Sequence, residues 1–122
     1  MGQQGYEVKA SFTNIGDLRV RAPVSIAGVR IGAVKKIQLD PKTFNALVTL
    51  EIDKDQNQIP SDSTASILTE GLLGSNYISI TPGFANTNLT NGATLGRTHS
   101  ALILENLIGQ LMYKLNSNKG AS

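Results

Sequence analysis

The stretch Tyr6-Glu7-Val8-Lys9-Ala10-Ser11-Phe12 alternates apolar and polar side chains without interruption. Successive side chains of a β-strand point to opposite faces, so this alternation gathers the apolar residues on a single face. The turn residues Asn14-Ile15-Gly16-Asp17 follow directly. The stretch therefore predicts a half-buried strand that packs one face into a core.

The same period of two continues in short segments as far as about Thr81, separated by Gly, Pro, Asn and Asp. Gly28 and Gly32 stand where a turn or bulge would need a positive φ, and Asp40-Pro41-Lys42-Thr43 is typical of a turn. Further strands are expected at residues 24–26, 29–31, 34–39, 46–52, 65–69 and 77–81, and 93–95 offers a brief last one. The pattern predicts an all-β domain, a small barrel of about seven short strands.

The apolar period changes near residue 100. Ser100 is a plausible N-cap, and apolar residues then recur at helical spacings of three and four. We expect one C-terminal α-helix over residues 100–115, followed by a flexible tail over 116–122. The residues that give this helix its broad apolar face are Leu104, Leu107, Ile108, Leu111, Met112 and Leu115.

This apolar face is wider than an appendage to a filled barrel needs. Burying one Leu or Ile contributes about 1.5–3 kcal/mol, so leaving several of them exposed favours association. The helix is therefore predicted to be an oligomerisation element. The alternative is that it packs across the outside of its own barrel.

Composition limits the remaining functions. The chain has 122 residues, 40% hydrophobic and 16% charged, with a net charge of +2, which is typical of a single water-soluble domain. It has no Cys and one His, His99, so thiolate chemistry and multi-histidine metal sites are excluded. Apart from His99, no base is a plausible partner for the Ser and Thr hydroxyls, and the basic residues are scattered. We expect a protein that is not an enzyme, holds no cofactor or metal and binds no nucleic acid.

Gly71-Leu72-Leu73-Gly74 is unusual for a connection between two strands. Such a turn is normally polar, and a period of two cannot bury two adjacent leucines in one small core. Either the loop folds back onto the barrel, or Leu72 and Leu73 serve a function outside the core. Both interpretations remain open from the residues alone.

Taken in order, several of these segments resemble the MCE (mammalian cell entry) domain family. The resemblance runs from Tyr6 to about Tyr113, and the order and spacing of the segments carry it. They are Phe12-Thr13-Asn14-Ile15-Gly16-Asp17-Leu18, Ala22 to Val29 with Gly32 and Val34, Leu39 to Thr43, Val48 to Ile52, Ile59-Pro60, Gly71 to Gly74, Ser100-Ala101 and Leu104 to Gln110. Ser75-Asn76 departs from the family pattern, in which a charged residue often follows the second glycine.

The resemblance implies an MCE-type barrel that assembles as a homohexameric ring on the periplasmic side of a Gram-negative inner membrane. Such rings are lipid-binding, pore-forming subunits of ABC systems that move phospholipids between the two membranes and maintain outer-membrane lipid asymmetry. The implied partners are a permease, an ATPase, a small STAS-domain subunit and a periplasmic lipid carrier. The paired leucines of the family's pore loop correspond to Leu72 and Leu73, and its helix bundle corresponds to residues 100–115.

The expected domain boundaries follow from both lines of reasoning. Residues 1–5 form a linker or starting segment, 6–97 form the MCE barrel, 100–115 form the oligomerisation helix and 116–122 form the tail. The resemblance also implies that an N-terminal transmembrane helix, absent from this sequence, anchors the domain. Two other classes stay open, namely a soluble monomeric β-barrel carrier of an apolar ligand and a cell-surface structural or adhesin-like protein.

Overall fold

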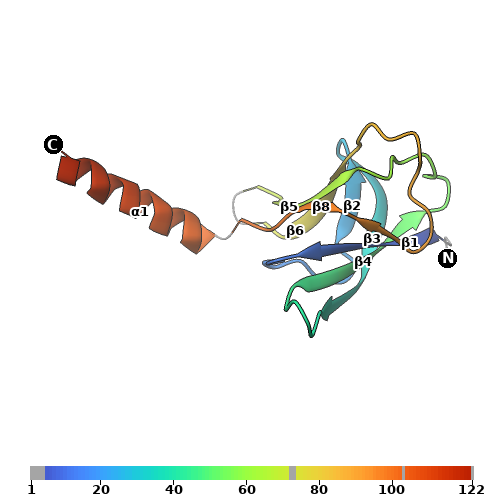
Figure 1. Ribbon diagram of the computed structural model, residues 1–122, viewed down its shortest axis with the longest axis horizontal. Coiled ribbons are helices and arrows are strands. Elements are labelled where there is room, and N and C mark those ends of the chain that lie inside the picture. The colour runs from blue at the N-terminus through green and yellow to red at the C-terminus, as the bar shows by residue number, and fades with distance from the viewer. Residues whose placement is uncertain (1–4, 72–73, 103, 122) are drawn as a thin grey trace.

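The computed structural model describes residues 5–71, 74–102 and 104–121, with the side chains of α1 described for residues 108–116. An eight-stranded barrel is followed by one helix (Figure 1). The elements are β1 (Gly5–Phe12), β2 (Pro23–Ile26), β3 (Val29–Leu39), β4 (Ala46–Asp53), β5 (Thr64–Thr69), β6 (Asn76–Thr81), β7 (Ala93–Leu95), β8 (Arg97–His99) and α1 (Leu104–Ala121). The predicted all-β class with a single C-terminal helix is confirmed.

The strands form one sheet in the order β7-β1-β4-β3-β2-β6-β5-β8. β7 and β8 are the two ends of this order, yet only Gly96 separates them in the sequence, so the two edges of the sheet are brought together. The Thr98 hydroxyl on β8 donates a hydrogen bond to the Ser11 carbonyl oxygen on β1 at 2.7 Å. The sheet is therefore a nearly closed barrel.

The alternating residues of β1 fill the barrel interior as predicted. Val8, Ala10 and Phe12 are buried, and β4 lies antiparallel to β1 with the register Val8↔Leu50 and Ala10↔Val48. The largest fully buried apolar side chains come from β1, β2, β3, β4 and β6 and are Phe12, Leu50, Ile52, Ile78, Ile80, Val8, Val24, Val34 and Val48. An interior packed in this way is stabilised by about 1.5–3 kcal/mol for each large apolar side chain.

The two glycines expected at positive φ behave differently. Gly28 has φ 81° and closes the turn between β2 and β3, as predicted. At Gly32 the expected irregularity is present, because the register with β2 shifts between Gly32 and Arg30, but the expected positive φ is wrong, since Gly32 has none and lies inside β3. A Cβ at Gly32 would overlap the Glu51 carbonyl oxygen on β4, so close strand approach is what requires glycine there.

Two further strand predictions need correction. Residues 29–39 form one continuous strand, β3, rather than two, and the register shifts opposite Val24/Ser25 and at Val34/Lys36 bend it. The brief strand at 93–95 is present as β7, but β8 was not predicted. Its sequence, Arg97-Thr98-His99, contains no apolar residue that could produce an alternating pattern.

The helix begins and ends later than the sequence predicted. It spans Leu104–Ala121 rather than 100–115, and residues 116–121 belong to it rather than to a tail. Ser100 is not an N-cap, because its Oγ accepts a hydrogen bond from the Thr13 backbone N–H at 2.9 Å. The Ala101 N–H likewise donates to the Asn14 carbonyl oxygen at 3.0 Å, so these two residues belong to the barrel and the helix can start only after them.

Candidate functional site

The two sides of the loop between β5 and β6 approach each other at its base, here called the neck, which comprises residues 69–71 and 74–76. The Glu70 backbone N–H donates to the Ser75 carbonyl oxygen at 3.1 Å, directly above the Thr69↔Asn76 pair that ends the β5–β6 ladder. Gly71 has φ 71°, a value that glycine adopts without strain. A Cβ at Gly74 would overlap the Glu70 carbonyl oxygen, so the second glycine is needed for the neck to close.

Asn76 fixes this neck to a neighbouring loop. Its side chain is 8% exposed, accepts a hydrogen bond from the Thr69 hydroxyl at 2.9 Å and donates one to the Ile15 carbonyl oxygen at 3.3 Å. The Ile15 loop is itself ordered, because the Asn14 side-chain oxygen accepts from the Gly16 N–H at 2.8 Å. Asn76 is thus a positioning residue for the β5–β6 loop.

Sequence reasoning missed this role and treated Ser75-Asn76 only as a departure from the family pattern. A signal was present, because Asn76 has the same strand parity as Ile78 and Ile80, whose side chains are buried. A polar residue at an inward-facing strand position must find hydrogen-bond partners. The parity alone therefore predicts a buried, hydrogen-bonded asparagine.

The two predicted pore residues, Leu72 and Leu73, lie outside the described residues. The geometry on either side of them, from Thr69 to Gly71 and from Gly74 to Asn76, is the part of the loop that the structure defines.

The helix leaves the barrel at the end where β5 and β6 meet (Figure 1). Of the predicted oligomerisation residues, Ile108, Leu111, Met112 and Leu115 are 54%, 58%, 55% and 48% exposed. Their spacing of three, four and seven places them on one face of α1. Leu104 and Leu107 also lie in α1, and their side chains fall outside the described part of the chain.

One short segment, Thr13–Ile15, connects the loop neck and the start of the helix. In this segment the Ile15 carbonyl oxygen accepts a hydrogen bond from the Asn76 side-chain amide, and the Asn14 carbonyl oxygen accepts one from the Ala101 N–H. Thr13 and Ser100 also share a hydrogen bond between their hydroxyls at 2.7 Å. The neck of the β5–β6 loop and the residues that precede the helix, Ser100 and Ala101, are therefore hydrogen-bonded to the same short segment.

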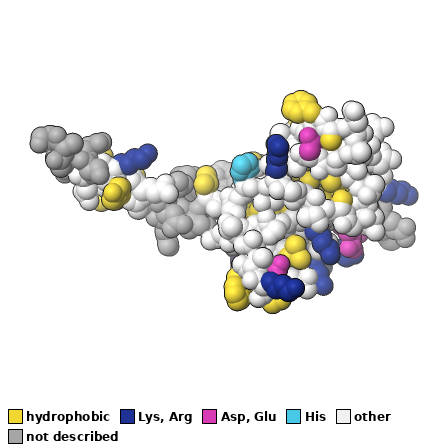
Figure 2. Space-filling model, viewed as in Figure 1, with side chains coloured by type: hydrophobic (Ala, Val, Ile, Leu, Met, Phe, Trp, Pro, Cys, Tyr) yellow, Lys and Arg dark blue, Asp and Glu magenta, His cyan; other side chains and the backbone are white. Residues whose placement is uncertain are grey.

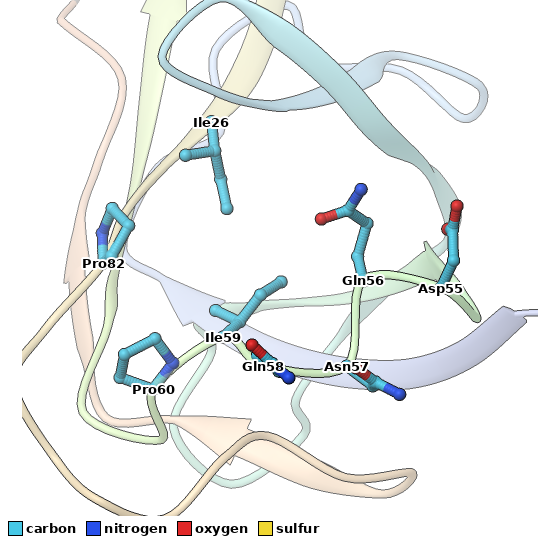
Figure 3. A pocket seen from close by; sticks show the side chains of 8 residues that line it. All are labelled: Ile26, Asp55, Gln56, Asn57, Gln58, Ile59, Pro60 and Pro82. Atoms are coloured by element: carbon cyan, nitrogen blue, oxygen red, sulfur yellow. The ribbon is translucent and has the colours of Figure 1, made fainter.

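The opposite end of the barrel carries an open hollow of about 430 Å³. Figure 3 shows Ile26 and Gln56 pointing into it from different segments, with Pro60 and Pro82 on its far side. The Tyr6 hydroxyl donates to the Gln56 carbonyl oxygen, and burial raises the pKa of Tyr6. Asp55 is the one titratable residue among those that line the hollow, so the lining offers no acid–base pair.

Among the described residues, no helix is long and apolar enough to cross a membrane.

Comparison with known proteins agrees with this geometry. The family model described as MlaD protein matches residues 4–83. The chain is 45% identical over 120 residues to the intermembrane phospholipid transport system binding protein MlaD of Haemophilus influenzae, covering 96% of this chain and 72% of the relative. It is 46% identical over 123 residues to the protein of the same name in Escherichia coli K12, covering 95% of this chain and 67% of the relative.

A solved structure is similar as well. A chain of the Acinetobacter MlaFEDB complex, in its ATP-bound Vtrans1 conformation, superposes with a TM-score of 0.79 at 29% sequence identity. The match covers 89% of this chain and 82% of that chain. The resemblance to MCE domains inferred from the residues is confirmed, and the family match together with these identities shows that the chain belongs to the MlaD protein family.

Proposed function

We propose that this chain is the phospholipid-binding, pore-forming subunit of an ABC transport system that moves phospholipids between the inner and outer membranes and maintains lipid asymmetry. The observation that carries the proposal is the placement of the Gly71–Gly74 loop neck and an exposed apolar helix face at one end of a filled barrel. The relatives named for intermembrane phospholipid transport support it. The chain is a transport component rather than an enzyme.

The physical need for such a subunit comes from the acyl chains. Exposing them to water costs about 0.8 kcal/mol per CH₂, so two chains of about fifteen carbons cost on the order of 25 kcal/mol. A phospholipid therefore needs a continuous dry path between the membranes. The core side chains, such as Phe12, Leu50 and Ile78, already occupy the interior of this barrel, so the path must run between copies of the chain.

A homohexameric ring provides that path. In it, each copy directs Leu72 and Leu73 toward the central axis, and the α1 helices extend the passage through their apolar faces. Each protomer then contributes apolar surface to the lumen without containing a cavity. The exposed Ile108, Leu111, Met112 and Leu115 supply the surface that such a helix bundle buries.

The proposed partners complete the system. A permease, an ATPase and a small STAS-domain subunit lie on the membrane and cytoplasmic sides, and a periplasmic carrier exchanges lipid with the ring. In Figure 1 the N-terminus and α1 lie at opposite ends of the molecule. This arrangement suits a periplasmic domain whose preceding transmembrane helix would anchor one end, while α1 extends away from the inner membrane.

Two alternatives make different demands on the structure. A monomeric carrier needs an internal cavity for its ligand, whereas the interior of this barrel is packed with buried side chains. An adhesin or structural protein does not need bound lipid. Both alternatives are separated from the proposal by the state of the purified protein.

Native mass spectrometry of the 122-residue chain measures subunit number and bound lipid together. We expect a hexamer that carries phospholipid. A monomer with one bound apolar ligand would favour the carrier, and a lipid-free species of any size after mild purification would contradict the transport role.

A further inference from the structure

The β3–β4 hairpin displays two large apolar side chains that the core does not use. Leu39 is 64% and Phe44 is 71% exposed. Asp40 builds the turn between them, because its carbonyl oxygen accepts from the Phe44 N–H at 2.8 Å and its Oδ1 accepts from the Lys42 N–H at 2.9 Å. The Asp40 N–H in turn donates to the Asn45 carbonyl oxygen at 2.9 Å. The hairpin tip is therefore a defined turn rather than a loose loop.

Phe44 occupies a backbone conformation that disfavours it. Its φ is 61°, in the left-handed region that glycine and asparagine adopt readily and bulky residues rarely enter. A fold selected for stability alone would place Gly or Asn at this position. Strain retained on an exposed aromatic residue indicates that its side chain serves a purpose outside the folded monomer.

A second rigid turn displays Phe84, which is 97% exposed. The Asp62 carboxylate accepts hydrogen bonds from the Phe84 N–H at 3.1 Å and the Ala85 N–H at 2.9 Å. The Ser63 hydroxyl oxygen accepts from the Gly83 N–H at 3.1 Å, and a Cβ at Gly83 would overlap Asp62. The side chain is thus presented on a fixed platform, which lowers the entropy lost when a partner covers it.

The two groups of exposed apolar side chains, Leu39 with Phe44 and Phe84 alone, lie on different sides of the barrel. In the closed strand order, β2 lies between the β3–β4 pair and the β6–β5 pair on one side, and β1, β7 and β8 lie between them on the other. Leu39 and Phe44 flank the β3–β4 turn, whereas Phe84 follows β6 and is held by Asp62, just before β5. In Figure 1 the β3–β4 hairpin lies at the lower margin of the barrel and the loop after β6 at the upper margin, and Figure 2 shows hydrophobic side chains at both margins.

A head-to-tail contact requires two unlike patches on different sides of the protomer. A self-complementary dimer uses one patch twice, whereas a closed ring joins one face of each copy to a different face of the next. We infer that the Leu39–Phe44 hairpin tip of one copy packs against the Phe84 platform of the neighbouring copy. This inference rests on the proposed ring and names the barrel-to-barrel contact within it.

The test measures assembly of the full 122-residue chain by sedimentation velocity and native mass spectrometry. Phe44→Asn and Phe84→Ser are each expected to weaken association by at least about tenfold, as the loss of a central aromatic contact does. Because asparagine tolerates positive φ, the thermal midpoint of the Phe44→Asn protomer should stay the same or rise. Val29→Ser is the matched control, since Val29 is also 64% exposed and lies on the same strand as Leu39.

Mixing the two variants gives the sharper readout. Phe84→Ser chains keep the hairpin tip and Phe44→Asn chains keep the platform, so a mixture can form one intact contact per pair. We expect mixed dimers that neither variant forms alone, and no closed rings. A mixture that equals the sum of its components would overturn the head-to-tail contact.

The assembly of the wild-type chain distinguishes a failure of this contact from a failure of the proposed ring. A wild-type ring that both aromatic variants leave intact would contradict this contact and leave the proposed function standing. A wild-type monomer would contradict both the contact and the proposed ring.

Discussion

The side-chain amide of Asn76 donates to the carbonyl oxygen of Ile15 across 61 positions of sequence, at 3.3 Å. This bond joins the neck of the β5–β6 loop to residues 13–15. The same segment binds the residues that precede α1, because the Asn14 carbonyl oxygen accepts from the Ala101 N–H. The base of the loop and the residues that precede the helix are therefore both hydrogen-bonded to residues 13–15. The two elements proposed to form the lipid passage are positioned by one short piece of backbone.

Replacing Asn76 with Ala is expected to lower the free energy of unfolding by about 0.5–1.5 kcal/mol, because the hydrogen bonds of its side chain with the Ile15 carbonyl oxygen and the Thr69 hydroxyl are lost. Urea denaturation measures the change. Ser75→Ala is the matched control, since the bond to Glu70 uses the Ser75 backbone rather than its hydroxyl. Equal stability of the two variants would show that Asn76 does not hold the neck.

Acid should weaken the Phe84 platform. The backbone N–H groups of Ala85 and Phe84 hold the pKa of Asp62 below its ordinary value. A carboxyl group with a lowered folded-state pKa stabilises the fold above its unfolded pKa, near 4, and loses that contribution as pH falls through the folded value. The sign therefore predicts a loss of stability only on acidification below about pH 4.

Asp62→Asn tests this directly, because an amide offers one acceptor oxygen to two N–H donors. We expect a lower urea midpoint than wild type at pH 7 and a smaller difference between the two proteins at pH 3. In the described part of the chain the Asp55 carboxylate accepts no backbone hydrogen bond, so Asp55→Asn is the control for charge loss. A wild-type-to-Asp62→Asn difference that grows in acid would contradict the assignment.

Most strands, whose alternating pattern is local, were predicted correctly, whereas Ser100 and Gly32, whose partners are distant in sequence, were not. The alternation in β1 and β4 gave the strands and their core faces, because each strand carries its own period. Ser100 was expected to cap a helix, but its partner Thr13 lies 87 positions away and holds it in the barrel. Gly32 likewise owes its place to the Glu51 carbonyl oxygen on the neighbouring strand.

In the candidate site, too, features set by local spacing were predicted and contacts between distant segments were missed. The helical spacing of Ile108, Leu111, Met112 and Leu115 gave their common face, and these side chains are exposed, while their role in assembly stays a prediction. The Asn76 hydrogen bonds and the strain at Phe44 depend on how separate loops meet, which no local pattern encodes.

Removing α1 should reduce the assembly while leaving the barrel folded. A chain that ends at Leu102 keeps the Ser100 and Ala101 bonds to residues 13 and 14 but lacks the apolar helix face. We expect smaller species by light scattering and a thermal midpoint close to that of the full chain. An unchanged ring would contradict the helix's role in assembly and leave the barrel contact as its source.

A chain cut before Ser100 is the informative comparison. It loses the same helix and, in addition, the hydrogen bonds from Thr13 and Asn14 to Ser100. It should therefore melt at a lower temperature than the chain that ends at Leu102. Equal thermal midpoints of the two truncated chains would show that Ser100 and Ala101 do not stabilise the barrel.

Replacing both Leu72 and Leu73 with Asn separates a packing role from a pore role. If the leucines pack the loop onto the barrel, the thermal midpoint should fall, because apolar contact is lost and amides are buried without partners. If they line the axis of a ring, the midpoint and the oligomer size should barely change, since the side chains face a lumen. Transport should nevertheless collapse, because a ring of amides binds water and interrupts the dry path that the acyl chains need.

The paired measurements are the melting temperature of the purified variant and the detergent sensitivity of cells that carry it in an otherwise complete, membrane-anchored transporter. We expect normal melting together with sensitive cells. Leu72→Ile combined with Leu73→Ile is the matched control, because it keeps the apolar surface and should protect the outer membrane. A double-Asn variant that melts normally and still protects the cells would defeat the pore assignment, because a hydrated ring cannot carry acyl chains at the cost estimated above.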